Sequence, residues 1–132
     1  MRNLLIAILF TIFLLTPKVN IFAGIAPVIT GQASWYSAHD KTDPFPHIHN
    51  ADGSKFNEND YTCALQSRDF GKRYKVTNLR NGRSVIVKHC DYGPAHSYKD
   101  RKLNRVIDLS KAAFMAIADL SEGVILVKVE EA

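Results

Sequence analysis

Apolar and polar side chains alternate along the stretch from Tyr74 to Pro94 of this 132-residue chain. The alternation covers residues 74–77 and 84–88 and has the period of two that is typical of β-strands with one face on a core. Between these segments, Asn81-Gly82 can take the positive φ angles of a tight turn at little steric cost. The stretch therefore predicts a β-hairpin. Ile86 breaks the alternation of the second strand, so we expect this strand to be covered on both faces.

Other short apolar segments predict the remaining strands, at residues 31–37, 61–65, 105–109 and 124–129. A helix is expected before the last of them, because Ser110 can cap its N-terminus and apolar residues on one helical face follow it: Ala113, Phe114, Ile117 and Ala118. Asp108 can be either a helix cap or an acid of a functional site, and the cap is the favoured interpretation. Many short strands with one short helix and one core favour a small closed β-barrel.

The N-terminal segment, residues 1–26, has the pattern of a secretory signal peptide. A basic head with Arg2 precedes an apolar run from Leu4 to Leu15, and small residues near Ala23 and Ala26 offer cleavage sites. A run of this length is too short to span about 30 Å of hydrocarbon as a helix, although an uncleaved anchor is the alternative. No cysteine lies near the cleavage region, which excludes lipid attachment there. We expect export to the periplasm or cell envelope and one mature domain, residues 27–132.

The charge balance argues against a nucleic-acid partner. The chain carries 17 Lys and Arg residues and 13 Asp and Glu residues, a net charge of +4. Loss of the signal peptide removes Arg2 and Lys18 and leaves a net charge of +2. This is too weak a field to indicate nucleic acid. We expect a monomer with no membrane span after removal of the signal.

Two cysteines, Cys63 and Cys90, are the whole complement of the chain. An even count in an exported domain predicts a disulfide between them. A metal site is disfavoured because one cysteine at each of two distant places does not form a ligand cluster. The polar segment 38–59 is predicted to be a long surface loop, and its histidines lack a matching set of ligands: His39, His47 and His49. We therefore predict neither a metal nor a cofactor.

Candidate functional residues lie at the ends of the predicted strands. Asp91 precedes Gly93-Pro94, where the second hairpin strand ends, and can either take part in chemistry or form an Asx turn. Trp35 and Tyr36 can stack on sugar rings, but neighbouring strand residues point to opposite faces, so one of the two is expected in the core.

Four ordered segments resemble the rare lipoprotein A group of bacterial envelope proteins. They are GQASWYS at 31–37, VTNLRNGRSVIV at 76–87, CDYGP at 90–94 and RVIDLSKAAF at 105–114. The resemblance covers essentially all of the chain after the signal peptide. It implies a mainly β fold, a six-stranded double-psi β-barrel with one short helix.

The resemblance also implies a peptidoglycan lytic transglycosylase, which cuts the glycan strand without water and leaves a 1,6-anhydro end. Such a reaction needs one acid/base group, because the 6-hydroxyl of the sugar itself attacks in place of water. By position in the family motif this group is Asp91. We expect Trp35, Tyr36 and Tyr92 to be the residues that stack on sugars. A non-catalytic glycan-binding barrel, like the expansins, is the alternative, and a secreted protease inhibitor or effector is a third.

The chain departs from the family pattern on both sides of this acid, where Cys90 and Tyr92 replace an asparagine and an arginine, and at two further positions that matter more. Ser54 stands where the family has an acid before an aromatic residue, and Leu65 stands where the family has a histidine. Neither side chain transfers protons at neutral pH. Three acids close in sequence to Ser54 are candidates to replace the missing one: Asp52, Glu58 and Asp60.

Overall fold

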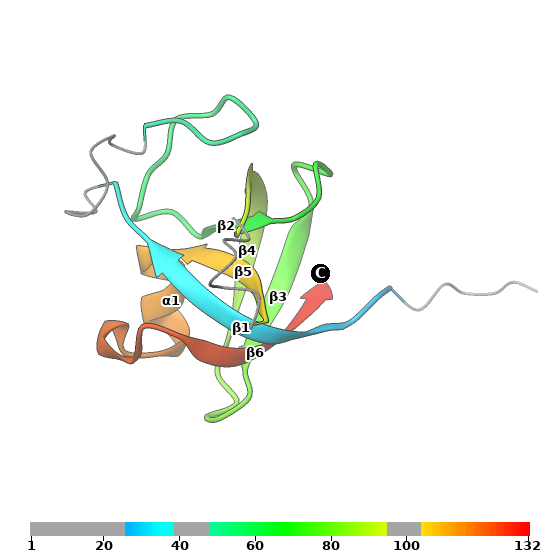
Figure 1. Cartoon of the computed structure of the whole chain (residues 1–132), viewed down its shortest axis with the longest axis vertical. Helices are drawn as coiled ribbons and strands as arrows, with labels where there is room; N and C mark the ends of the chain where they lie inside the picture. The colour runs from blue at the N-terminus through cyan, green and yellow to red at the C-terminus, as the bar shows by residue number, and fades with distance from the viewer. Residues whose placement is uncertain (1–25, 39–47, 95–103) are drawn as a thin grey trace, which may run out of the picture.

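Six strands close into a barrel in the computed structural model, which describes residues 26–38, 48–94 and 104–132 (Figure 1). The order around the barrel is β1-β5-β2-β4-β3-β6. The β1·β5 and β2·β4 pairs are parallel and the other four pairs are antiparallel. In chain order the elements are β1 (Ile29–Tyr36), β2 (Thr62–Leu65), β3 (Arg73–Asn78), β4 (Ser84–Tyr92), β5 (Arg105–Ser110), α1 (Lys111–Ile117), η2 (Leu120–Glu122) and β6 (Ile125–Glu131).

The predicted hairpin is confirmed as β3 and β4. Gly82 has a φ of 75° and its N–H donates to the carbonyl of Asn78, which closes the turn. The side chain of Asn81 donates to the carbonyl of Ile117 at 2.9 Å, as does the side chain of Asn78. The turn is therefore fixed to the C-terminal end of α1. The carbonyl groups at the end of a helix lack intrahelical donors, and these two side chains supply donors to the carbonyl of Ile117.

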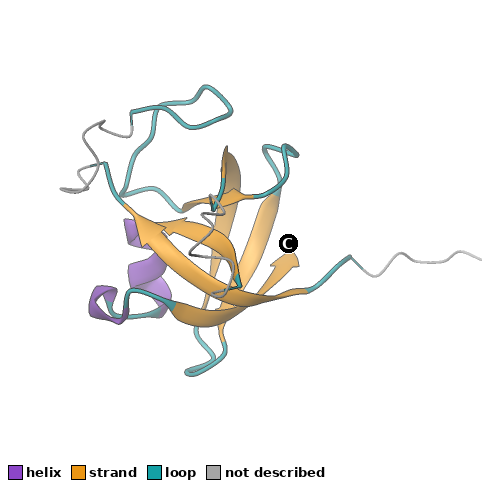
Figure 2. Cartoon of the chain, in the orientation of Figure 1, coloured by secondary structure: helices purple, strands orange, loops and turns teal. Residues whose placement is uncertain are grey.

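The expectation that the second hairpin strand is covered on both faces is wrong. Ile86 is 43% exposed, while Val85 and Val87 on its two sides are buried. The barrel is one layer of strands, and α1 covers one end of it instead of the outer surface of this strand (Figure 2). The apolar side chain at position 86 therefore faces outward.

The core lies inside the barrel and under α1. Alternate residues of the strands fill it, and Phe114 from the helix is fully buried among them. The other large buried side chains of the core include Ile107, Leu109, Ile117, Val76, Val87, Val127 and Val129. The helix thus plugs the barrel with its predicted apolar face.

The helix cap is Ser110, as predicted, and Asp108 is not a cap. The Ser110 hydroxyl accepts from the N–H of Ala113 at 3.3 Å and donates to the carbonyl of Asp60 at 2.6 Å. Asp108 lies on the opposite face of β5 from the buried Ile107 and Leu109. This leaves its carboxylate on the outer face of the barrel.

The predicted disulfide is wrong, because both cysteines are free thiols. In the parallel β2·β4 pair, Cys63 lies opposite His89, and a register shift follows before Ala64 meets Asp91. Cys90 falls in this shift and therefore has no partner across the pair. Its sulfur lies 4.0 Å from the carbonyl oxygen of Cys63. Both side chains are buried and pack as small apolar groups.

Burial of Cys63, together with the nearby Cys90 and Asp91, raises the pKa of its thiol above the ordinary value. As the pH rises, the Cys63 thiol of the unfolded chain therefore ionises before that of the folded chain. The free energy of unfolding is unaffected below about pH 8.5 and falls as the pH rises beyond it. We expect the melting temperature to decline over this alkaline range, and to decline less in Cys63→Ala. Equal declines in thermal unfolding of the two proteins would contradict this assignment.

Parts of the sequence predictions lie outside the described residues. These are residues 1–25 of the predicted signal peptide, His39 and His47. Within the ranges that the structure describes, no helix is long and apolar enough to cross a membrane.

Candidate functional site

Asp91 lies near the end of β4 and is held there by backbone amides. Its Oδ1 atom accepts from the N–H of Ala51 and from the N–H of Tyr92, each at 2.9 Å. The side chain is only 7% exposed. These two bonds fix the carboxylate in one orientation, as both the catalytic role and the predicted turn role require.

The segment that supplies the Ala51 amide is a small hairpin at residues 48–56. It is closed by a bridge between His49 and Lys55, and it is joined to β4 a second time, through the N–H of Asp52 and the carbonyl of Cys90 at 3.1 Å. In Figure 1 this segment arches above one end of the barrel. The loop thus covers the end of β4 and accounts for the low exposure of Asp91.

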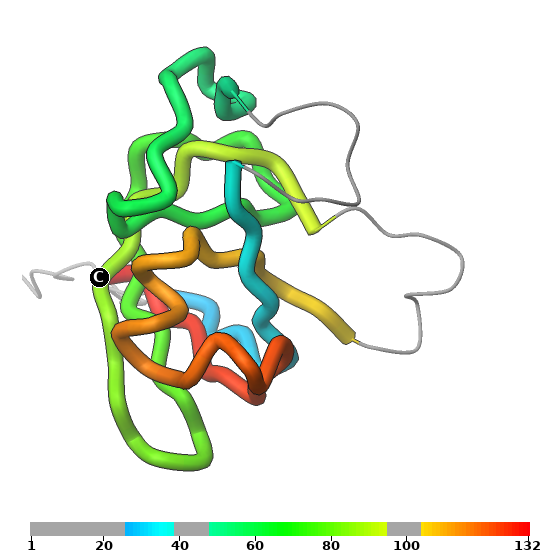
Figure 3. Tube along the Cα trace, turned by 90° about the vertical axis from the view of Figure 1, so that its left-hand side faces the viewer, coloured from blue at the N-terminus to red at the C-terminus, as the bar shows by residue number. Residues whose placement is uncertain are grey.

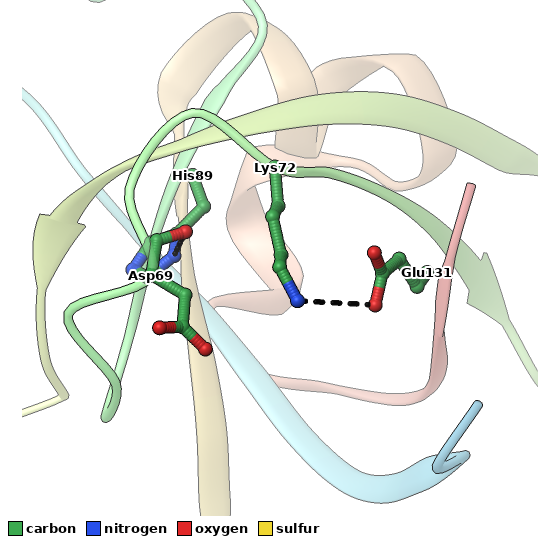
Figure 4. A network of polar contacts seen from close by, with 4 residues as sticks. All are labelled: Asp69, Lys72, His89 and Glu131. Atoms are coloured by element: carbon green, nitrogen blue, oxygen red, sulfur yellow. Dashed lines mark hydrogen bonds and ion pairs between the residues drawn. The ribbon is translucent and has the colours of Figure 1, made fainter. Parts of the chain in front are cut away.

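His89 supports Asp91 from inside the barrel and was not identified from the sequence. The ring is fully buried, and its Nε2 atom lies 3.0 Å from the carbonyl oxygen of Asp91. Its Nδ1 atom lies 3.2 Å from the carbonyl oxygen of Asp69 (Figure 4). Val85, Val87 and His89 form the inward face of the strand. The alternation that predicted the strand therefore also places a polar residue in the core, where it needs such partners.

A second carboxylate shares the outer face of the barrel with Asp91. Ala64 of β2 lies opposite Asp91 on one side and opposite Asp108 on the other. Ser34 of β1 lies opposite Asp108, and its hydroxyl donates to the Asp108 carboxylate. Residues directly opposite each other in a sheet point to the same face, so these four residues, here called the acid row, cross four strands side by side. With neighbouring strands about 4.8 Å apart, the Asp91 and Asp108 backbones are about 10 Å apart.

Tyr36 belongs to the same face as the acid row. It lies two residues after Ser34 on β1 and stacks on the ring of Phe56, with ring centroids 4.9 Å apart. Burial raises the pKa of the Tyr36 phenol, and the charges of Asp91 and Asp108 are among the further causes. The phenol therefore lies in the field of both carboxylates and keeps its proton at neutral pH.

The other two predicted aromatic residues differ in exposure. Trp35 packs against the core, and its indole N–H donates to the carbonyl of Leu120 at 3.2 Å, so the structure favours its core alternative. Tyr92 is 50% exposed and carries the guanidinium of Arg68 5.0 Å from its ring centroid. Of the two, Tyr92 is the side chain that presents a ring to solvent.

Of the acids near Ser54, Asp52 lies beside Asp91. Ser54 is exposed and donates to the Asp52 carboxylate from both its hydroxyl and its N–H, which lowers the pKa of Asp52. Asp52 is therefore ionised at neutral pH and is unsuited to donate a proton. Glu58 is committed elsewhere, because it accepts from the N–H of Ala38 and pairs with Lys111 at 3.7 Å.

Leu65, at the position of the family histidine, is buried in the core, with 6% exposure. Asp60 contacts Ser110 through its backbone carbonyl. Leu65 has no group that transfers protons, and the contact of Asp60 with Ser110 does not involve its carboxylate. Asp91 and Asp108 are therefore the buried and half-buried carboxylates that the fold itself aligns.

A cavity of about 520 Å³ opens at another part of the barrel and includes neither acid. Leu65, Tyr74 and Val129 are among its apolar lining, and Lys72 pairs with Glu131 at 3.5 Å on its rim, with Asp69 nearby (Figure 4). Within the described ranges, no cluster of three or more histidine, cysteine or acidic side chains is arranged to bind a metal.

The chain belongs to the lytic transglycolase family of double-psi β-barrel domains, whose family profile matches residues 28–129. This confirms the resemblance to the rare lipoprotein A group and the fold that it implies.

Several relatives carry that group's name. The "Probable endolytic peptidoglycan transglycosylase RlpA" of Synechocystis sp. is 42% identical over 113 residues, which cover 81% of this chain and 31% of the relative. The "Endolytic peptidoglycan transglycosylase RlpA" of Neisseria meningitidis serogroup A is 35% identical over 102 residues, 77% of this chain and 38% of the relative. The chain thus spans about a third of the length of these relatives.

Solved structures share the fold at low sequence identity. The "Streptomyces papain inhibitor (SPI)" superimposes with a TM-score of 0.60 at 21% identity, over 81% of this chain and 96% of the inhibitor. An apo expansin of Clavibacter michiganensis gives a TM-score of 0.58 at 20% identity, over 80% of this chain and 50% of the expansin. At these identities the likeness shows the barrel alone.

Proposed function

We propose that this domain cleaves the glycan strands of peptidoglycan as an endolytic transglycosylase, with Asp91 as the acid/base group. The observation that carries the proposal is the acid row, in a chain whose relatives are named as peptidoglycan transglycosylases. In this mechanism Asp91 first protonates the oxygen of the leaving sugar. The same carboxylate then accepts the proton of the 6-hydroxyl as that oxygen closes on the anomeric carbon.

Asp108 and Tyr36 have supporting roles in this proposal. The Asp108 carboxylate, across Ala64 from Asp91, stabilises the positive charge that develops on the sugar ring. The Tyr36 phenol keeps its proton beside both carboxylates, so it adds no negative charge to the site. Tyr92 offers its exposed ring for stacking on a neighbouring sugar.

A second candidate function is glycan binding without cleavage. It is favoured by Ser54 and Leu65, which replace the family acid and histidine, and by the two backbone amides that already occupy Asp91 Oδ1. For this function the carboxylates of Asp91 and Asp108 would accept hydrogen bonds from sugar hydroxyl groups. Export to the periplasm or cell envelope and action as a monomer are further proposals that either function shares.

Digestion of purified glycan strands separates the two functions. The full chain is incubated with strands that lack peptides, and the products are separated by chromatography and weighed by mass spectrometry. Transglycosylase activity predicts shorter strands with 1,6-anhydro ends. Intact strands, together with sedimentation of the protein with whole peptidoglycan, would exclude cleavage and leave the binding function.

A further inference from the structure

The β3–β4 hairpin concentrates positive charge on one face of the barrel. Between Asp69 and Asp91 the sequence holds six bases and no acid. Five of them are exposed side chains outside the ion pairs found in the described residues. These five, here called the basic face, are Arg73, Lys75, Arg80, Arg83 and Lys88.

The strand register explains why the charges gather. Arg73 lies directly opposite Lys88, and Lys75 lies opposite Ile86, so these side chains share the outer face of the hairpin. Like charges directly opposite each other destabilise a sheet, and no core packing on this outer face requires them. A negatively charged surface would offset the repulsion between Arg73 and Lys88.

Exposed aliphatic side chains lie among these bases. Ile86 is 43% exposed beside Lys75, and Leu79 is 49% exposed at the turn beside Arg80. Leu126 of β6, 57% exposed, is next to Leu79, whose N–H donates to its carbonyl at 3.0 Å. Aliphatic groups surrounded by bases match a surface that offers both anions and hydrocarbon.

Acids near this face are engaged in contacts of their own. Glu130, opposite Lys75, pairs with Lys128 at 3.2 Å. Glu122 and Asp119 cap η2. The Asp119 carboxylate accepts from the N–H of Ser121, and the Glu122 carboxylate accepts from the N–H of Asp119. They reduce the positive charge at the turn. In the described part of the chain Arg73 and Lys75 form no ion pair, and Lys88 lies in the field of the Asp52 carboxylate.

The turn end of the basic face, with Arg80 and Arg83, lies away from the acid row. Figures 1 and 3 both place the β3–β4 turn at the end of the barrel opposite the 48–56 hairpin. β4 begins beside this turn and reaches Asp91 seven residues after Ser84, so the turn lies roughly 25 Å from Asp91, whereas Lys88 at the other end of the basic face lies about 10 Å from it. A large partner centred on the turn end of the basic face would therefore leave the acid row accessible.

We infer that the basic face docks on the surface of a membrane rich in anionic phospholipids, with Leu79, Ile86 and Leu126 entering the headgroup region. The inference is independent of the proposed reaction. Weak attraction of several bases to anionic headgroups, combined with a few shallow aliphatic contacts, gives reversible binding. The barrel would be held at a membrane surface while its other end reaches the glycan.

Vesicle sedimentation tests this inference. The full chain is mixed with vesicles of equal parts phosphatidylglycerol and phosphatidylcholine, or of phosphatidylcholine alone. Both offer the same hydrocarbon for the apolar run Leu4–Leu15, and the bases beside it, Arg2 and Lys18, are common to every variant compared below. We expect preferential binding to the anionic vesicles that weakens with added salt. Equal binding to both vesicles would overturn the inference.

Paired variants locate the binding. Removal of two charges in Lys75→Gln/Lys88→Gln is expected to lower partitioning about 25-fold, since each base contributes a factor of about five. The matched control Lys55→Gln/Arg68→Gln removes two exposed charges outside the basic face and is expected to bind normally. An equal loss in the control would show a net-charge effect and overturn the inference.

A third variant distinguishes a membrane from a soluble polyanion. Leu79→Ser/Ile86→Ser keeps every charge, and we expect weaker vesicle binding because the aliphatic contacts are lost. Unchanged vesicle binding in this variant would contradict lipid docking. Tight binding of the unaltered chain to soluble polyphosphate without binding to vesicles would also overturn it, in favour of a polyanion.

Discussion

Replacement of Asp91 by asparagine is expected to lower the rate of 1,6-anhydro end formation by about 10²- to 10⁴-fold, the usual contribution of a general acid/base. Asparagine keeps the size of the side chain and an oxygen that can accept from the Ala51 and Tyr92 amides. The 48–56 hairpin should therefore stay attached to β4, and the melting temperature should change little. Loss of activity without loss of stability is the signature of a proton-transfer role.

Two further variants make this result interpretable. Asp69→Asn removes an exposed carboxylate from the rim of the cavity, which neither Asp91 nor Asp108 lines, and should retain activity. Asp108→Asn should lower the rate while Asp91 still transfers protons. Full activity in Asp91→Asn combined with its loss in Asp108→Asn would assign the acid/base role to Asp108 and contradict the proposal.

Replacement of Phe114 by alanine should cause the largest loss of stability. Phe114 is fully buried where α1 enters the barrel, and truncation of such a residue costs about 3 to 5 kcal/mol, through lost burial and the cavity that remains. Denaturant unfolding measures the change. For a domain of this size the loss is a large part of the total free energy of unfolding.

Met115 provides the control on the same helix. It is 53% exposed, so Met115→Ala keeps the helix and should change the free energy of unfolding by no more than about 0.5 kcal/mol. Similar losses for the two variants would mean that α1 does not plug the barrel.

Local patterns in the sequence predicted the elements because their causes are local. The Asn81-Gly82 turn and the Ser110 cap depend on a few neighbouring residues, and both are confirmed, although Asn81 acts through its side chain on Ile117 instead of through a positive φ. The closed barrel followed from the number of short strands, but the double-psi topology came from the family resemblance.

Register across distant strands could not be predicted. The disulfide was wrong because a shift between β2 and β4 sets Cys63 opposite His89 and not Cys90. Pairing of β2 with both β4 and β5 also brings Asp108 into the same row as Asp91. The residues next to Asp108 in the sequence do not indicate this position. Ile86 was misassigned because alternation identifies a strand but does not reveal what covers its second face.

The central claim is that the strand breaks by attack of its own hydroxyl, with Asp91 moving one proton, and the products formed in ¹⁸O-labelled water test it most directly. The account predicts new ends that carry no label and that weigh one water molecule less than hydrolysed ends. Label in the new ends would show hydrolysis and contradict the account.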